Sequence, residues 1–557
     1  MCRKLIALLL FIVTIQVTKA QNEFITVWKP GNVQPYAYDG IPMNSTGNQI
    51  WLPTEGINYQ ITWEEIGYPS HTGILSGVIS GYHILVDFGT SLNPDPANAT
   101  YRVKVESGSG SFHRIRFTDW DLFPVGNGII GDSHKILLVE QWGETQWSSM
   151  RQAFQGCNLM NITATDLPRL ASVSDFSFMF TNCSSLTGNP TINDWNISSV
   201  TNLQSTFQGC FLFNQPVGNW DTSNVVNMGT TFLMAQKFNQ PLAGWNTSNV
   251  ETMTAMFNNA REFNQPIGNW DLSENLDCEF MFSNAWKFNQ PIGNWNTSKV
   301  VEMNSMFSNA KVFNQNIGSW NTSEVLYMQN MFFNATAFNQ NIGNWNTSKV
   351  TSMNQMFSNA TSFNQNIGNW NTSHVSSMGN MFSNASAFNQ NLGNWNLNDL
   401  TLASGMFSNS GMNCQNYDNT LIGWSQKPST PNSIFLSPVA PLAYSDPAAI
   451  SARNYLITVK NWTISGDIYN GECHTVLGTS DAITQSEETI YPNPATDFIF
   501  VRNSEMKNFT IFDQSGRTVL KGMLNDGKID IRNLVSGNYI LQLISDKNSR
   551  NLKFIKQ

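Results

Sequence analysis

The chain has 557 residues, of which 41% are hydrophobic and 12% charged, and its 30 basic and 39 acidic side chains give a formal net charge of −9. This length predicts roughly three or four domains at about 150 residues each, with enough apolar residues for folded cores. The acidic balance disfavours nucleic acids and anionic membranes as partners, because both select clustered Lys and Arg.

Residues 1–20 have the features of a secretory signal peptide. Two basic residues precede the apolar segment 5–17, and small residues at positions 18 and 20 predict cleavage between Ala20 and Gln21. The apolar segment is too short to cross a membrane as a helix. We therefore expect an exported protein with no integral membrane span.

Residues 21–130 are predicted to form a β-rich N-terminal domain. Runs of strand-forming residues occur at 60–63, 83–88 and 101–105. Segments rich in Gly, Pro, Asn and Ser separate these runs. Several short strands with frequent turn residues predict a β-sandwich-like fold.

A repeat of 25 residues dominates the segment 135–410. Tryptophan recurs at this interval from Trp195 to Trp395, and phenylalanine does so from Phe207 to Phe407. A fixed period in this range indicates one supersecondary unit stacked on copies of itself.

Each unit is predicted to contain a short helical turn and a short strand. Apolar residues with helical spacing occupy residues 250–260, and residues 267–270 fit a strand. Positions that are identical in every repeat are expected to be structural. These repeat columns include Trp220, Trp245, Trp270, Trp295, Trp320, Phe257, Asn264 and Asn289.

Six cysteines remain after removal of the signal peptide. Four fall in packed repeat columns, where free thiols behave as small hydrophobic groups, although stacked cysteines could also form disulfides. Cys414 and Cys473 are a candidate disulfide. No cysteine spacing resembles a zinc site, so we expect no bound metal. The four column cysteines are Cys157, Cys183, Cys210 and Cys278.

The repeat resembles the BspA-like leucine-rich repeat of bacterial surface proteins. The residues that carry this resemblance follow the pattern Trp-Asn/Asp-Thr-Ser-x-Val-x-x-Met-x-x-Met-Phe-x-x-Ala-x-x-Phe-Asn-Gln-x-Ile-Gly. The resemblance covers about 135–470 and implies a leucine-rich-repeat-like solenoid of 25-residue coils. Residues 411–477 lose the period and are expected to cap the solenoid, and residues 478–488 form a polar linker.

Residues 489–557 are again rich in strand-forming residues and are predicted to form a small β-sandwich. The segments 491–494, 534–539 and 553–556 (Tyr-Pro-Asn-Pro, Leu-Val-Ser-Gly-Asn-Tyr and Lys-Phe-Ile-Lys) resemble the type A sorting domain of the type IX secretion system. This resemblance implies export by that machinery from a Bacteroidetes-type bacterium, followed by release or surface attachment. The predicted fold is therefore a repeat solenoid flanked by two β-sandwich-like domains.

The sequence carries no recognisable catalytic motif. Its six histidines are scattered, and it contains neither a nucleophile elbow nor a phosphate-binding loop. We therefore predict no catalytic residue and no cofactor.

Specificity is expected where the repeats differ, because the shared residues are needed by every repeat. The variable positions between residues 251 and 324 are charged, and a non-repeat tryptophan lies among them. This band is either a contact surface or merely a solvated face. The candidate ligand contacts are Arg261, Glu262, Glu274, Asp277, Trp286, Lys287, Lys299 and Lys311.

Three functions follow from these observations. The favoured one is a non-enzymatic recognition or adhesion protein, secreted or on the cell surface, that binds a protein or a glycan through the repeats. The alternative is a structural component of the cell envelope. An enzyme in the N-terminal domain is the least favoured.

Overall fold

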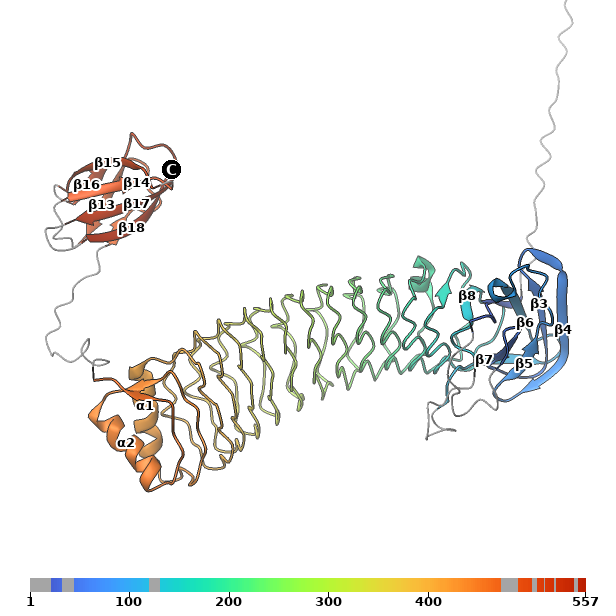
Figure 1. Ribbon diagram of the computed structural model, residues 1–557, viewed down its shortest axis with the longest axis horizontal. Coiled ribbons are helices and arrows are strands. Elements are labelled where there is room, and N and C mark those ends of the chain that lie inside the picture. Colours follow the sequence, from blue (N-terminus) through green and yellow to red (C-terminus); the bar gives the residue numbers. More distant parts are fainter. Residues whose placement is uncertain are drawn as a thin grey trace, which may run out of the picture. The chain divides into compact units, whose positions relative to one another are not determined.

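The computed structural model describes most of the chain in two compact units, Met1–Val476 and Leu477–Gln557 (Figure 1). The predicted signal peptide with its Ala20–Gln21 cleavage site, the linker 478–488 and Cys473 lie outside the described residues. None of the helices in the described segments has the length and apolarity needed to cross a membrane. The described residues are 22–32, 45–119, 131–471, 489–502, 508–514, 516–524, 527–544 and 549–557.

A seven-stranded sheet opens the first unit. Its order is β4-β3-β6-β1-β8-β9, with β7 also paired to β3, while β2 and β5 form a separate two-stranded sheet. In β6 every second residue is buried, as expected for a strand with one face on a core. The strand bounds are β1 Phe24–Trp28, β2 Gln49–Leu52, β3 Thr54–Glu65, β4 Tyr68–Ser80, β5 Ile84–Asp87, β6 Tyr101–Glu106, β7 Ser111–Ile115, β8 Ile136–Gln141 and β9 Asn161–Ile162, and the short helix η1 is Pro96–Asn98.

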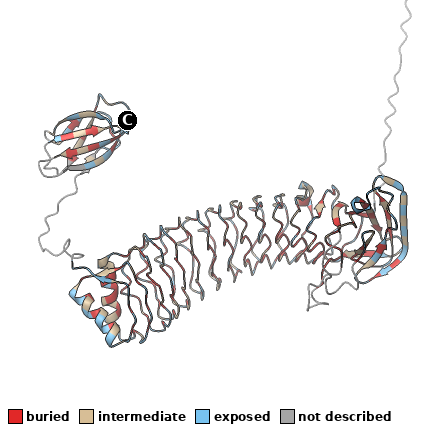
Figure 2. Cartoon of the chain, in the orientation of Figure 1, coloured by how far each residue is buried: buried red, intermediate tan, exposed pale blue. Residues whose placement is uncertain are grey.

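The N-terminal strands and the repeats share one hydrophobic core, which runs from Phe24 to Ile464 (Figure 2). Trp142 follows β8 and joins the two parts. Its ring lies 6.0 Å from that of Phe24 in the sheet and 5.3 Å from that of Trp195 in the repeats. Because β8 and β9 complete the sheet from beyond residue 130, the sheet and the first repeats pack as one body.

A half-buried histidine, His134, lies just before β8 beside two charged side chains. Burial lowers the pKa of His134 to about 4; the charge of Asp132 opposes this shift and that of Lys135 adds to it. An unfolded histidine has an ordinary pKa of about 6.5 and takes up a proton between pH 6.5 and 4, whereas the folded one does not. The folded state therefore loses stability as the pH falls through this window.

We expect His134→Gln to remove this part of the pH dependence. Between pH 7 and pH 4.5 the wild-type protein should lose about 2 kcal/mol more unfolding free energy than the variant. Urea denaturation followed by circular dichroism at both pH values measures the difference. Parallel losses in the two proteins would show that another group is responsible.

The repeats are built from turns joined by isolated parallel bridges. Between the short helix η2 (Pro190–Asp194) and the helix α1 (Cys414–Ser425) the fully described chain contains no helix and no strand. Single bridges connect equivalent residues of successive repeats, for example Thr252 to Asp277 and Asp277 to Glu302. Figure 1 shows these repeats as successive turns of chain lying side by side.

Backbone hydrogen bonds join neighbouring repeats, and most of them are donated toward the following repeat. The backbone N–H groups of residues 253, 255, 257 and 259 donate to the carbonyl oxygens of residues 277, 279, 281 and 283, at 2.7 to 3.0 Å. Ala255 and Asn259 have φ values of 51° and 59°. These left-handed residues turn alternate N–H groups toward the next repeat, so each repeat is paired on both sides.

The predicted fold class is therefore wrong. The sequence predicted a leucine-rich-repeat-like solenoid with a short helical turn and a short strand in each coil, whereas the regular elements are mostly strands in several small sheets, with few helices. Two left-handed residues in 250–260 exclude a right-handed helix there. Residues 267–270 form a turn, closed by the N–H of Trp270 donating to the carbonyl of Ile267 at 3.1 Å.

The shared residues form continuous columns through the repeats. Each tryptophan from Trp220 to Trp395 is buried, and its indole N–H donates to a backbone carbonyl 28 residues earlier, as Trp295 does to Ile267 at 3.0 Å. The side-chain oxygen of Asn264 accepts from the N–H of Asn289 at 2.9 Å and from the amide of Gln290 at 3.0 Å. These bonds satisfy polar groups at the edge of the core.

Four of the cysteines are buried free thiols, and Cys414 is disulfide-bonded. The thiols of Cys183 and Cys210 donate to the carbonyls of Phe154 and Phe180, one repeat earlier. Burial raises the pKa of each of the four free thiols, which keeps them protonated. The partner of Cys414 lies outside the described residues, so the pairing with Cys473 stays a prediction.

Residues after the last repeat cover its end. The N–H groups of Gly405 and Asn409 donate to the carbonyls of Ser437 and Ala440, at 3.0 and 2.7 Å. Behind this layer, Arg453 forms two 2.7 Å bonds with the carboxylate of Asp467. The elements of this segment are α1 Cys414–Ser425, β10 Ala443–Tyr444, α2 Pro447–Thr458 and β11 Ile468–Tyr469.

The second unit, taken by itself, consists of two small antiparallel sheets. One has the order β12-β13-β16 and the other β15-β14-β17-β18. Ile499, Ile511, Leu541 and Phe554 belong to the buried cluster of this unit. The strand bounds are β12 Thr489–Tyr491, β13 Phe498–Arg502, β14 Asn508–Phe512, β15 Thr518–Met523, β16 Lys528–Asp530, β17 Gly537–Ile544 and β18 Ser549–Lys556.

Candidate binding surface on the repeats

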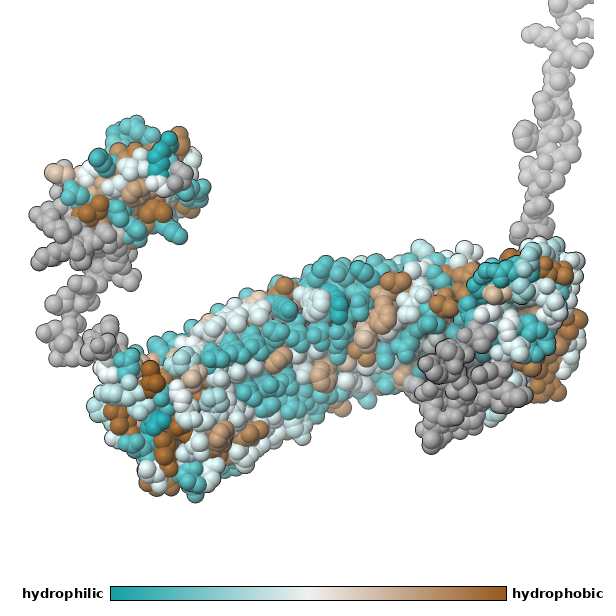
Figure 3. All heavy atoms as spheres, viewed as in Figure 1, coloured by the Kyte–Doolittle hydropathy of each residue, from teal (hydrophilic) through white to brown (hydrophobic). Residues whose placement is uncertain are grey.

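The eight candidate contact residues occupy three different places in the repeat. Arg261, Trp286 and Lys311 share one position, because they are 25 residues apart, and Glu262 and Lys287 share the next position. Those two adjacent positions form the first place. Glu274 and Lys299 share the second place, and Asp277 lies in the third, where single bridges join successive repeats. Figure 3 shows that the visible face of the repeats is largely hydrophilic, with scattered apolar residues.

Arg261 and Trp286 form a cation–π pair across neighbouring repeats. The guanidinium carbon of Arg261 lies 4.3 Å from the centre of the Trp286 ring, and the tryptophan is 42% exposed. Among the described residues, the Nε of Arg261 is buried without a hydrogen-bond partner. Such a pair contributes about 0.5–1 kcal/mol at an exposed site and holds both side chains in one arrangement.

An ion pair lies directly beside it. The ammonium of Lys287 and the carboxylate of Glu262 are 2.5 Å apart. The hydrogen bond from Lys287, then the charges of Lys287 and Lys237, lower the pKa of Glu262 against the opposing effect of burial. We call Arg261, Glu262, Trp286 and Lys287 the 261–287 edge; it combines an aromatic face with charges of both signs.

The next residue in the Trp286 column, Lys311, is exposed, and its backbone carbonyl accepts from the N–H of Ala337 at 3.2 Å. The sequence interpretation omitted Lys237, which precedes Glu262 by one repeat. Its signal was present, since Lys237, Glu262 and Lys287 occupy the same position in three successive repeats.

Glu274 and Lys299 form a separate surface ion pair at 2.6 Å, with both side chains half exposed. The same pair recurs as Glu324 and Lys349, also at 2.6 Å. In this column the imidazole of His374 contacts the carbonyl of Ser348 at 3.0 Å. Exposed pairs of this kind contribute little to stability. They occupy a different position of the repeat from the residues of the 261–287 edge.

Asp277 is held by its own neighbours. Its carboxylate accepts from the hydroxyl of Thr254 at 2.5 Å and from the N–H of Glu279 at 2.8 Å. Burial and the charge of Asp277 raise the pKa of Glu279, and burial with the charges of Asp277 and Glu279 raises that of Glu302. The described segments contain no group of three or more His, Cys, Asp or Glu side chains that could hold a metal ion.

The C-terminal unit identifies the class of protein. Residues 489–557 match the family described as secretion system C-terminal sorting domain. This match indicates a secreted or cell-surface protein that is exported by type IX secretion, and it implies an interaction with that machinery.

The repeats have relatives of their own. Residues 148–265, 240–340 and 312–424 match the family described as Mycoplasma protein of unknown function, DUF285. No curated protein matches the chain. Neither comparison assigns a function to the repeats.

Proposed function

We propose that this protein is a non-enzymatic recognition or adhesion protein that binds a protein or a glycan through the 261–287 edge of its repeats. The observation that carries the proposal is the exposed ring of Trp286 with Arg261 stacked on it. Equivalent positions in later repeats carry Thr336, Thr361 and Ser386.

Two physical arguments support this assignment. The tryptophan and phenylalanine columns shared by the repeats are buried in the core and cannot contact a partner, whereas Trp286 and Lys287 at variable positions are exposed. Trp and Arg are enriched among residues that dominate binding energy, because both combine a large contact area with directional polar groups. The charges of Glu262 and Lys287 supply a polar rim beside this centre. The resemblance of the repeats to those of BspA-like surface proteins also favours a recognition role.

The test is an array of extracellular matrix proteins and bacterial and host glycans, probed with the full mature protein. We expect Trp286→Ala and Arg261→Ala each to weaken binding of the captured partner by about tenfold or more, a loss of about 1.4 kcal/mol. Lys349→Ala is the matched control, because it removes a charge from an exposed pair outside the edge and should leave the affinity unchanged.

Equal affinity of the wild-type protein and both edge variants would reject the edge as the contact surface. Absence of any partner on the array, together with assembly of the mature protein into ordered arrays, would favour a structural envelope component instead.

A further inference from the structure

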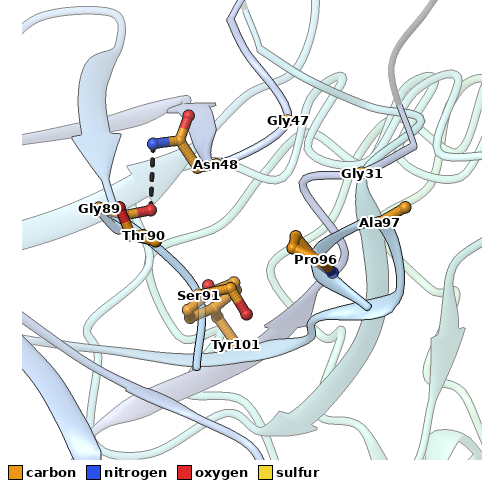
Figure 4. A pocket seen from close by; sticks show the side chains of 9 residues that line it. All are labelled: Gly31, Gly47, Asn48, Gly89, Thr90, Ser91, Pro96, Ala97 and Tyr101. Atoms are coloured by element: carbon orange, nitrogen blue, oxygen red, sulfur yellow. Dashed lines mark hydrogen bonds between the residues drawn. The ribbon is translucent and has the colours of Figure 1, made fainter. Parts of the chain in front are cut away.

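The N-terminal part of the first unit contains a cavity of about 440 Å³ that offers a ligand no charge (Figure 4). None of its described lining residues is charged. Two of its polar side chains are bonded within the protein: the amide of Asn48 donates to the carbonyl of Gly89 at 3.1 Å, and the hydroxyl of Ser91 donates to Glu65 at 2.6 Å. The surface of the repeats differs from this cavity, because it carries charges without partners.

Four successive repeats each place one cation at the same turn. Two adjacent positions of the repeat hold these cations, which are Lys237, Arg261, Lys287 and Lys311. The three lysines are exposed and the arginine is half-buried. The single acidic residue at these two positions is Glu262, so four positive charges face one negative charge. We call the four basic residues the cation ladder.

The cation ladder is confined to these four repeats. The same two positions hold Phe211 and Leu212 one repeat earlier, and Thr336 and Ala337 one repeat later. The fold of the repeat therefore does not require a cation at this turn. The whole chain is acidic, with a formal net charge of −9, so a local excess of positive charge does not follow from its composition.

Most of these cations lack a carboxylate partner. Lys287 pairs with Glu262 at 2.5 Å, but the described residues supply no ion pair to the other three cations. The second charged column of the repeats is different, because Lys299 and Lys349 each meet a glutamate one repeat earlier, at 2.6 Å. Like charges on neighbouring chain segments repel each other, so an uncompensated excess of cations favours an anionic partner.

The spacing of the ladder and the exposed ring beside it favour a sugar polymer as this anion. The ladder follows successive repeats, in which the equivalent rings of Phe257 and Phe282 are 5.7 Å apart. One cation per repeat is therefore close to one cation per residue of an extended polysaccharide. The ring of Trp286 is 42% exposed within the ladder, and it gives the apolar face of a sugar ring a surface on which to stack.

A peptide would find fewer contacts at this turn. The N–H of Glu262 donates to the carbonyl of Gln236 at 3.2 Å, and the N–H of Ala337 donates to the carbonyl of Lys311 at 3.2 Å. These bonds occupy backbone groups that an extended peptide would need in order to add as a strand. The side chains, by contrast, remain open to a charged polymer.

We propose that the cation ladder binds an acidic polysaccharide that lies along the repeats, with its carboxylate or sulfate groups paired to Lys237, Lys287 and Lys311. This inference rests on the proposed function and narrows its ligand to a polyanionic glycan. Arg261 stays stacked on Trp286 and holds that ring beside the bound chain. The carboxylate that pairs with Lys287 opposes binding, because it competes with the ligand for this ammonium group.

The test is isothermal titration calorimetry of the full mature protein with polymannuronate and dextran sulfate oligomers, which carry carboxylates and sulfates respectively. Unsulfated dextran of equal length is the neutral comparison. We expect at least one acidic oligomer to bind and dextran not to bind. Raising NaCl from about 50 to 200 mM should weaken this binding about tenfold, because association releases bound counterions.

Substitutions in the ladder should change the affinity in opposite directions. Lys237→Gln and Lys311→Gln should each weaken binding about threefold to fivefold, because each removes one contact to an anionic group. Glu262→Gln should tighten binding about threefold, because it removes the one opposing charge. Lys349→Gln is the matched control: it removes the same charge from an exposed position outside the ladder and should leave the affinity unchanged.

Equal weakening by Lys349→Gln and Lys237→Gln, or no tightening by Glu262→Gln, would overturn the ladder as the site. Equal or tighter binding of poly-L-glutamate or single-stranded DNA would also overturn the proposal and would assign the ladder to an acidic protein or a nucleic acid.

Failure of this inference can be distinguished from failure of the proposed function. If no acidic polysaccharide binds, but a neutral glycan or a protein binds and is lost in Trp286→Ala, this inference is overturned and the proposed function stands. If no ligand depends on Trp286, both are rejected.

Discussion

Replacing Trp295 with alanine is expected to lower the free energy of unfolding of the first unit by about 3–5 kcal/mol. The Trp295 ring is 3% exposed and lies 6.2 Å from Trp320 and 6.1 Å from Phe282. Its indole N–H donates to the carbonyl of Ile267 at 3.0 Å. The substitution therefore leaves a cavity in the column and a buried carbonyl without its partner.

The same repeat supplies a matched control. Trp286 is nine residues earlier and 42% exposed, so Trp286→Ala should change the free energy of unfolding by less than about 1 kcal/mol. Urea denaturation followed by far-UV circular dichroism measures both variants. Equal destabilisation by the two substitutions would contradict the division into a structural column and an exposed edge.

Arg453→Met should destabilise the first unit by about 3–5 kcal/mol. The carboxylate of Asp467 is fully buried and depends on two bonds from Arg453 and one, at 3.0 Å, from the hydroxyl of Tyr417. Methionine keeps much of the side-chain volume but removes the positive charge. The buried carboxylate then loses its compensating charge within the segment that covers the last repeat.

Lys299→Met is the control for this prediction. It removes one partner of an exposed ion pair in the same unit, and its cost should stay below about 1 kcal/mol. The measurement is again urea denaturation, combined with limited proteolysis of residues 411–471. If Arg453→Met is as stable as Lys299→Met, the buried pair does not hold the covering segment in place.

Trp295 and Trp286 show that the sequence can predict which tryptophans are buried and which are exposed. Trp295 keeps the 25-residue interval and Trp286 does not, and this difference alone separates the buried ring from the exposed one. The reason is that equivalent residues of stacked repeats meet copies of themselves. Identical apolar side chains are therefore compatible only with a shared core.

The backbone of the repeat could not be predicted in the same way. Residues 250–260 have helical apolar spacing, yet Ala255 and Asn259 adopt left-handed conformations. Side-chain spacing does not report the hydrogen bonds that the next repeat offers, and those bonds select the observed conformation over a helix. The helical preference of the local sequence is outweighed by the hydrogen bonds to the next repeat, which determine the backbone conformation.

The charged band was predicted as one surface, but the structure divides it. Arg261 contacts Trp286, and Glu262 beside it pairs with Lys287, whereas Glu274 pairs with Lys299 at another place in the repeat. The repeat interval contains this information, because the paired residues are 25 positions apart. A count of charged residues along the chain ignores this interval and therefore does not show which charges meet.

The sequence by itself determined the repeat interval, the residues of the buried columns and the C-terminal sorting domain. Only the tertiary structure decided how the repeat backbone is paired, which charges meet, and that Gly47, Gly89 and Tyr101 enclose one cavity. Gly47 and Gly89 come together because β2 and β5 pair with each other, and Tyr101 begins β6 of the other sheet. Pairing between distant strands follows from how all the strands pack at once, so no local pattern in the sequence specifies it.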